Sequence, residues 1–90
     1  MDAKMRVGGT AVLLRDGGDG LETLLIRRPD RGSFAGAWVF PGGVVENADV
    51  VAGESEETGA ARAAARECEE EVGLRPADLF VLSCWVPPVE

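Results

Sequence analysis

Short apolar runs separated by turn signals occupy the first third of the chain and predict β-strands. Residues 5–15, MRVGGTAVLLR, combine strand composition with partial alternation of apolar and polar positions, as in a half-buried strand. The sequence DGGDG at 16–20 is a strong turn signal, and the apolar run LETLLIRR follows at 21–28. A glycine-rich turn between two such runs predicts a hairpin, or at least two neighbouring antiparallel strands.

The central part of the chain predicts a short strand that glycines interrupt. Residues 29–37 have loop composition, and WVF at 38–40 predicts a strand that stops at the tight turn PGG, 41–43. The sequence VVE at 44–46 resumes as a brief extension. Residues 47–56 are irregular, with acidic side chains that suit the first turn of a following helix.

An alanine-rich segment predicts one helix from about residue 57 to residue 72. Gly73 is placed to end it, because glycine adopts the left-handed conformation that closes many helices. Residues 77–86, ADLFVLSCWV, predict a last strand, which two prolines close. The order of three strand segments, a helix and a strand predicts a small α/β or α+β sandwich.

Length and composition narrow the class of protein. Ninety residues predict one domain at most, and a hydrophobic fraction of 46% is ordinary for a globular chain. No apolar run reaches the roughly 18 residues of a membrane span, and the N-terminus lacks the apolar core of a secretory signal. Cys68 and Cys84 do not make a disulfide framework, so we expect reduced thiols. These features predict a cytoplasmic protein with no membrane partner.

Charge and residue types exclude several kinds of chemistry. A net charge of −7 argues against a nucleic acid as the main partner, because its phosphates need clustered lysines and arginines. The chain has no histidine, which removes Ser-His-Asp and Cys-His catalysis in their usual forms and histidine-containing zinc sites. If the protein is an enzyme, carboxylates and a metal remain. A phosphorylated small molecule stays compatible with the negative charge if a metal brings the two together.

The sequence RECEEEVGL at 66–74 places four glutamates within five positions. At 100° per residue, Glu67, Glu70 and Glu71 share one helix face about 100° wide, whereas Glu69 falls on the polar side. Three carboxylates beside a buried stripe disfavour one another's ionised forms unless a cation intervenes. The small apolar stripe next to them consists of Ala61, Ala64, Ala65, Cys68 and Val72.

Two explanations fit this acidic face. One is a bound Mg²⁺ or Mn²⁺, since hard cations take oxygen ligands, often one or two carboxylates plus substrate phosphates. The other is a solvated acidic helix end. The glycine turn upstream favours the metal, because glycines permit close backbone approach and a carbonyl of Gly42 or Gly43 can complete an oxygen site. Each feature alone has an ordinary explanation, and the two together are harder to dismiss.

PGG followed by RECEEEVGL resembles the Nudix box, the signature of hydrolases that act on nucleoside diphosphates linked to another moiety. The lead-in sequences LLIRR and GAWVFPGG are also similar to the family, so the resemblance covers nearly the whole chain. It implies a Nudix-like mixed-sheet sandwich, with a Nudix hydrolase domain over residues 1–90 and its box at about 42–74. The second half of the box is filled without a gap by Arg66, Glu67, Cys68, Glu70, Glu71, Gly73 and Leu74.

The chain departs from the family's pattern in two ways, of which the first lies within the box. Gly43 lies 23 positions before Arg66, nine more than in the plain box. GGVVENAD followed by a longer loop resembles the Nudix branch that includes coenzyme A diphosphatases, which also carries an aspartate there. Thr58 stands where the plain box has a glutamate, and Glu57 or Glu54 can substitute for it.

The second departure concerns the elements that follow the box. Nudix domains resemble one another in having further strands and a C-terminal helix beyond it. The resemblance therefore implies that this sequence is the N-terminal portion of such a domain. We expect an open sheet edge and an uncovered apolar face, which favour association, for example into a homo-oligomer.

The resemblance implies a metal-dependent hydrolase that cleaves the diphosphate linkage of a small-molecule nucleoside diphosphate derivative. The ligands of Mg²⁺ or Mn²⁺ are then the glutamates and one glycine carbonyl, with Glu70 as the central ligand. A carboxylate takes the proton of a bound water, and the sequence leaves Glu67 and Glu71 open as that base. The full ligand set consists of Glu67, Glu70 and Glu71, with Gly42 or Gly43.

Two arginines complete the predicted site. Arg66 orients the box glutamates through ion pairs, its alternative being an ordinary solvated arginine. Arg28, at the end of a predicted strand, binds a substrate phosphate or is plain surface charge. Trp38 and Phe40 are predicted to be core residues rather than groups that stack on a base, and Cys68 a small buried hydrophobe.

Two alternatives to the hydrolase remain. One is a Nudix-fold module that binds a nucleotide-like ligand without cleaving it, and the other is an inactive fragment of the hydrolase. The box does not select among nucleoside triphosphates, ADP-ribose, dinucleoside polyphosphates and coenzyme A as substrates.

Overall fold

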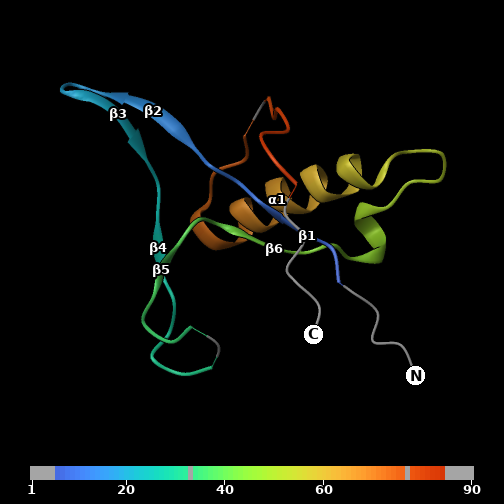
Figure 1. The fold of residues 1–90 in the computed structure, drawn as a ribbon, viewed down its shortest axis with the longest axis horizontal. Helices are drawn as coiled ribbons and strands as arrows, with labels where there is room; N and C mark the ends of the chain where they lie inside the picture. Colours follow the sequence, from blue (N-terminus) through green and yellow to red (C-terminus); the bar gives the residue numbers. More distant parts are fainter. Residues whose placement is uncertain (1–5, 33, 77, 85–90) are drawn as a thin grey trace.

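In the part of the chain that the structure describes, the strands pair antiparallel, two by two, and one pair lies along a long helix (Figure 1). The computed structural model describes residues 6–32, 34–76 and 78–84. Within them the α+β class is confirmed. The elements, in chain order, are β1 (Gly8–Thr10), β2 (Leu14–Gly17), β3 (Gly20–Thr23), β4 (Ile26–Arg27), β5 (Trp38–Val39), β6 (Gly42–Val44), the 3₁₀-helix η1 (Asn47–Asp49) and α1 (Glu56–Val72).

The predicted hairpin is confirmed as β2 and β3. Leu14 pairs with Thr23 and Gly17 with Gly20, so Gly18 and Asp19 form a two-residue turn. The two predicted long strands are each divided, because the chain changes partners along them. β1 pairs with β6 and β2 with β3, while β4 pairs with β5. Figure 1 shows the β2–β3 hairpin projecting away from α1, whereas β1 and β6 lie beside it.

The glycines of the PGG sequence belong to a strand, and the prediction of a tight turn there is wrong. Gly42 and Gly43 lie in β6, opposite Thr10 and Gly9 of β1. The interruption after β5 falls at Phe40 and Pro41 instead, and the buried Pro41 accepts a hydrogen bond from the Ala11 amide at 2.8 Å. A methyl group on Gly42 would overlap the Gly9 carbonyl oxygen. Glycine is therefore needed here for close strand pairing, not for a turn.

Helix α1 confirms the predicted helix and its end. The Ser55 side chain accepts a hydrogen bond from the Thr58 amide at 3.2 Å, which caps the first turn. Gly73 adopts φ 76°, and its amide donates to the Glu69 carbonyl at 2.9 Å, the arrangement of a left-handed C-terminal cap. Both boundaries thus follow from local side-chain chemistry.

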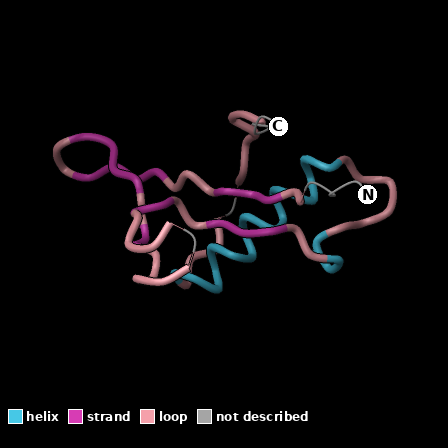
Figure 2. Tube along the Cα trace, turned by 60° about the horizontal axis from the view of Figure 1, so that its bottom comes forward, coloured by secondary structure: helices cyan, strands magenta, loops and turns pink. Residues whose placement is uncertain are grey.

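Small side chains let α1 lie close to the β1–β6 pair (Figure 2). Ala63, Ala64 and Cys68 are buried, and a methyl group on Gly9 would overlap the Ala60 carbonyl oxygen. Of the predicted stripe, Ala64, Ala65 and Cys68 are buried, whereas Ala61 and Val72 are only half-buried. Ala63, which was not in that stripe, is fully buried, so the packed face is rotated toward Glu67. Burial raises the pKa of the Cys68 thiol.

Two sequence predictions are wrong: the last strand, and the burial of Trp38 and Phe40. Residues 78–84 form no strand, and Phe80 and Leu82 are exposed; residues 77, 85 and 86 of that predicted strand lie outside the described residues. Trp38, predicted to be core, is 65% exposed, and Phe40 is 38% exposed. Within the described part of the chain, no helix is long and apolar enough to cross a bilayer.

Candidate active site

The free edge of β6 faces the charged side of α1. The Val45 amide donates to the Val7 carbonyl and the Ala11 amide to the Pro41 carbonyl, both at 2.8 Å. In this antiparallel ladder, Gly42 and Val44 therefore occupy the alternate positions, whose backbone groups point away from β1. On that side the Gly42 amide donates to Glu71 Oε1 at 3.0 Å.

Glu67 lies directly over the backbone of β6. A methyl group on Gly43 would overlap its carboxylate, so the absence of a side chain at Gly43 makes room for that group. The Glu67 side chain is only 20% exposed. A glutamate of the helix and a glycine of the strand are thus brought together across 24 positions of sequence, as the acidic-face interpretation required.

Arg66 connects the helix to the loop that precedes it. Its Nε and Nη2 donate to the two carboxylate oxygens of Asp49 at 3.0 and 2.9 Å. Nη1 lies 3.3 Å from Glu70 Oε2 and 3.5 Å from Glu67 Oε2, and Nη2 also donates to the Val44 carbonyl at 3.2 Å. The Arg66 side chain is 18% exposed and contacts several carboxylates at once, so it is a half-buried ion-pair partner and not a solvated surface arginine.

Asp49 is the residue of this site to which the sequence assigned no role. Its side chain is buried and also accepts from the Glu46 amide at 2.8 Å, and the Asp49 carbonyl accepts from Arg62 Nη1 at 2.7 Å. The hydrogen bonds from Arg66, and then that from Glu46, lower the pKa of the Asp49 carboxyl. The only sequence signal was the aspartate of GGVVENAD.

The glutamates proposed to replace the missing box glutamate lie elsewhere. Thr58 takes part in the cap at the start of α1, and Glu54 accepts two hydrogen bonds from Arg62 at 2.8 and 3.2 Å. Glu57 is exposed on the first turn. The carboxylate that meets Arg66 from outside the helix is that of Asp49, together with the more distant Glu46 at 3.8 Å.

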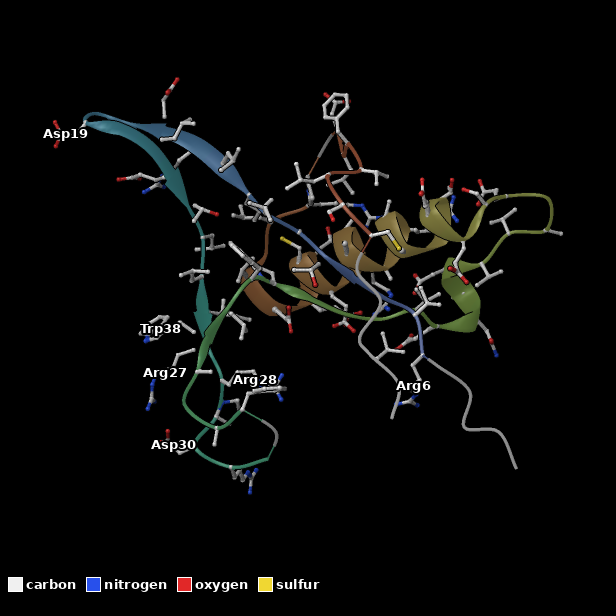
Figure 3. The ribbon with its side chains drawn as sticks, in the orientation of Figure 1. Arg6, Asp19, Arg27, Arg28, Asp30 and Trp38 are labelled. Atoms are coloured by element: carbon white, nitrogen blue, oxygen red, sulfur yellow. The ribbon has the colours of Figure 1, made fainter. Side chains whose placement is uncertain are left out.

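A cleft of about 390 Å³ adjoins this edge of β6. Glu71, Gly42 and Gly43 line one part of it, and Arg28 lines another. Figure 3 shows Arg28 on the opposite side of the β4–β5 ladder from Arg27 and Trp38. Two residues predicted from the sequence to serve the metal and the substrate, Glu71 and Arg28, therefore share one cleft.

A scan against protein families matches the NUDIX domain to residues 5–89 of this chain. The chain belongs to the Nudix family. At the level of the family, Nudix domains are hydrolases of nucleoside diphosphate derivatives and generally use divalent cations such as Mg²⁺. A search of curated proteins and a search of solved structures each returned no match.

The side chains of the Nudix box fit a hard cation in type, although each already has a protein partner. Glu71 accepts from the Gly42 amide, and Glu70 and Glu67 contact Arg66. Among the described residues, no three carboxylates are arranged so as to hold a metal ion. The available donors are nonetheless three carboxylates, and the Glu67 carboxylate occupies the space left by the missing side chain of Gly43. Oxygen donors of this kind suit Mg²⁺.

The electrostatics of Glu67 also favour a cation. Burial raises the pKa of its carboxyl, and the neighbouring Glu70, Glu71 and Glu46 add to the rise against the opposing effect of Arg66. A carboxylate in these surroundings is held in its charged form at some cost to the folded state. A divalent cation beside it would remove that cost.

We expect Glu67→Gln to raise the melting temperature of the metal-free protein at pH 7 by a few degrees. The pKa of the Glu67 carboxyl is higher in the folded protein than its ordinary value of 4.5. The folded state therefore loses stability as the pH rises from 4.5 through the folded-state pKa. Glutamine removes the buried charge and keeps the volume. Thermal melts at pH 7 and pH 4 measure this, and the gain should disappear at pH 4. A variant that melts lower than the wild type at pH 7 would contradict the assignment.

Proposed function

We propose that this protein is a metal-dependent hydrolase that cleaves the diphosphate linkage of a nucleoside diphosphate derivative, with its Nudix box at 42–74. The observation that carries the proposal is the junction of β6 and α1. There Arg66 joins Asp49 to two box glutamates, and Glu67 and Glu71 lie against Gly43 and Gly42. This junction borders the cleft that Arg28 lines.

The backbone of β6 supports Gly42 over Gly43 as the carbonyl ligand. In the ladder, Gly43 stands opposite Gly9 at a position whose carbonyl points toward β1, whereas the Gly42 carbonyl points to the free edge on which Glu71 lies. Glu67, Glu70 and Glu71 with the Gly42 carbonyl would then hold Mg²⁺ or Mn²⁺. When bound, the cation neutralises the diphosphate and lowers the pKa of a bound water.

The protein's own residues have separable tasks in this scheme. Glu67, with its raised pKa, is suited to accept the proton of the attacking water. Arg66 is a positioning residue, because it contacts Glu67 and Glu70 and is itself held by Asp49. Arg28 donates to a phosphate oxygen in the cleft, as guanidinium groups do readily.

A hydrolysis assay tests the reaction class. The full chain is incubated with ADP-ribose, coenzyme A and a dinucleoside polyphosphate, with and without Mg²⁺, and the products are separated by chromatography. We expect cleavage at the diphosphate linkage that depends on the metal. Binding of these compounds without any turnover in Mg²⁺ or Mn²⁺ would instead identify a nucleotide-binding module.

Mg²⁺ is expected to stabilise the folded protein. A ligand at ten times its Kd adds about 1.4 kcal/mol to the free energy of unfolding, or roughly 6–11 °C in the melting temperature of a domain of this size. Scanning fluorimetry over a Mg²⁺ titration measures the shift, with Glu70→Gln as the variant that should lose it. Equal shifts in both proteins would place the ion elsewhere on this acidic chain.

A further inference from the structure

The cleft beside the candidate metal ligands has an apolar floor and a basic end. Ile26 and Val39 are cross-strand partners on the cleft side of the β4–β5 ladder. Because side chains alternate along a strand, Arg28 falls on the same side as Ile26, and Arg27 and Trp38 fall on the other, as Figure 3 shows. The floor is therefore a surface for an apolar group, close to a guanidinium.

Phe34 borders this cleft in a conformation that packing does not explain. Its side chain is 81% exposed and lines the cleft, and its backbone has φ 55°. Bulky residues rarely adopt positive φ, and such outliers occur preferentially where a ligand is held. A large apolar ring that is kept exposed, at a cost in backbone energy, beside an open cleft is suited to contact a ligand.

Residues 34–37, at the end of the loop that carries Phe34, are joined by hydrogen bonds to one another and to the start of the loop. The Gly36 amide donates to the Pro29 carbonyl and the Ala37 amide to the Phe34 carbonyl, each at 3.0 Å. The ion pair between Arg27 and Asp30, 2.8 Å long, packs against Gly36, where an added methyl group would lie 3.2 Å from Arg27 Nη2. Phe34 is thus presented to the cleft by a braced loop.

We propose that Phe34 stacks on the nucleobase of the substrate, with Phe40 and the Ile26–Val39 floor beneath it. The diphosphate then extends past Arg28 toward Glu71 and Gly42, which line the same cleft. The placement of the diphosphate in this inference rests on the proposed function. A volume of about 390 Å³ lies within the usual range for small-molecule sites, and an aromatic ring stacks on any base without needing a hydrogen-bond partner.

The test compares two ligands that differ in the ring. Calorimetry measures the affinity of the full chain for α,β-methylene ADP, which resists cleavage, and for methylenediphosphonate, which has the diphosphate mimic alone. We expect Phe34→Ala to weaken binding of the nucleotide analogue about tenfold and to leave the diphosphonate unchanged. Phe34→Tyr should restore nucleotide binding. Trp38→Ala, an exposed aromatic on the other face of the same ladder, is the matched control and should change neither affinity.

The outcomes separate this inference from the proposed function. No loss in Phe34→Ala, or equal losses for both ligands, would overturn the stacking role even in an active hydrolase. A loss confined to the nucleotide would support that role even in a protein that shows no turnover. Thermal melts of each variant identify any change in affinity that arises from unfolding.

Discussion

Glu70→Gln is expected to lower metal-dependent kcat at saturating Mg²⁺ by at least about 100-fold, the scale of losing one well-placed electrostatic contact in a transition state. Glutamine keeps the volume of the side chain and removes the charge that would hold the cation. The folded protein should be nearly unaffected, because the Glu70 side chain is 58% exposed and its ion pair with Arg66 spans one helical turn. Exposed pairs of this kind contribute little to stability.

The matched control for this variant is Glu69→Gln. Glu69 is the neighbouring residue, is similarly exposed and also pairs with an arginine, Arg75, at 3.2 Å, but it faces away from β6. It should retain wild-type kcat and KM. Steady-state kinetics on one active substrate measures both variants. Turnover of Glu70→Gln within a few-fold of the control would refute the metal-ligand assignment.

Asp49→Asn is expected to lower both stability and activity. It removes the bidentate carboxylate partner of the half-buried Arg66 guanidinium, and removing one partner of a buried ion pair is destabilising. Of its carboxylate partners, Arg66 then keeps only the longer contacts with glutamates, at 3.3 to 3.8 Å. We expect a fall of roughly 5–10 °C in the melting temperature at pH 7. A loss in kcat of about 10-fold to 100-fold is the scale for outer residues that orient metal ligands.

The pH dependence of the loss in melting temperature shows whether it arises from the charge of Asp49 or from the packing of the substituted amide. The lowered folded-state pKa of Asp49 means that its stabilisation is present above the unfolded value of about 3.9 and is lost as pH falls through the folded value. The difference in melting temperature between wild type and Asp49→Asn should therefore shrink below about pH 4. A difference that persists unchanged at pH 3 would assign the effect to packing of the amide.

The sequence alone determined the features that depend on neighbours in the chain. Helix α1 was predicted within one residue because alanine propensity, the acidic residues suited to the first turn and the terminal Gly73 all act locally. The β2–β3 hairpin followed from its glycine turn. The box glutamates were found by their spacing, since positions three and four apart share a helix face, and the family match bears out the resemblance.

Tertiary structure decided what those residues meet. The pairing of Asp49 with Arg66 joins positions 17 apart, and no local rule places a loop carboxylate beside a particular arginine. The strand at Gly42 and Gly43 arises from a partner more than 30 residues away, which outweighs the turn preference of PGG. Residues 78–84 had the composition of a strand, but a strand requires a hydrogen-bonding partner, and composition cannot supply one. Exposure of Phe34 and Trp38 likewise depends on what covers each face of a ladder, a property of packing and not of the residue itself.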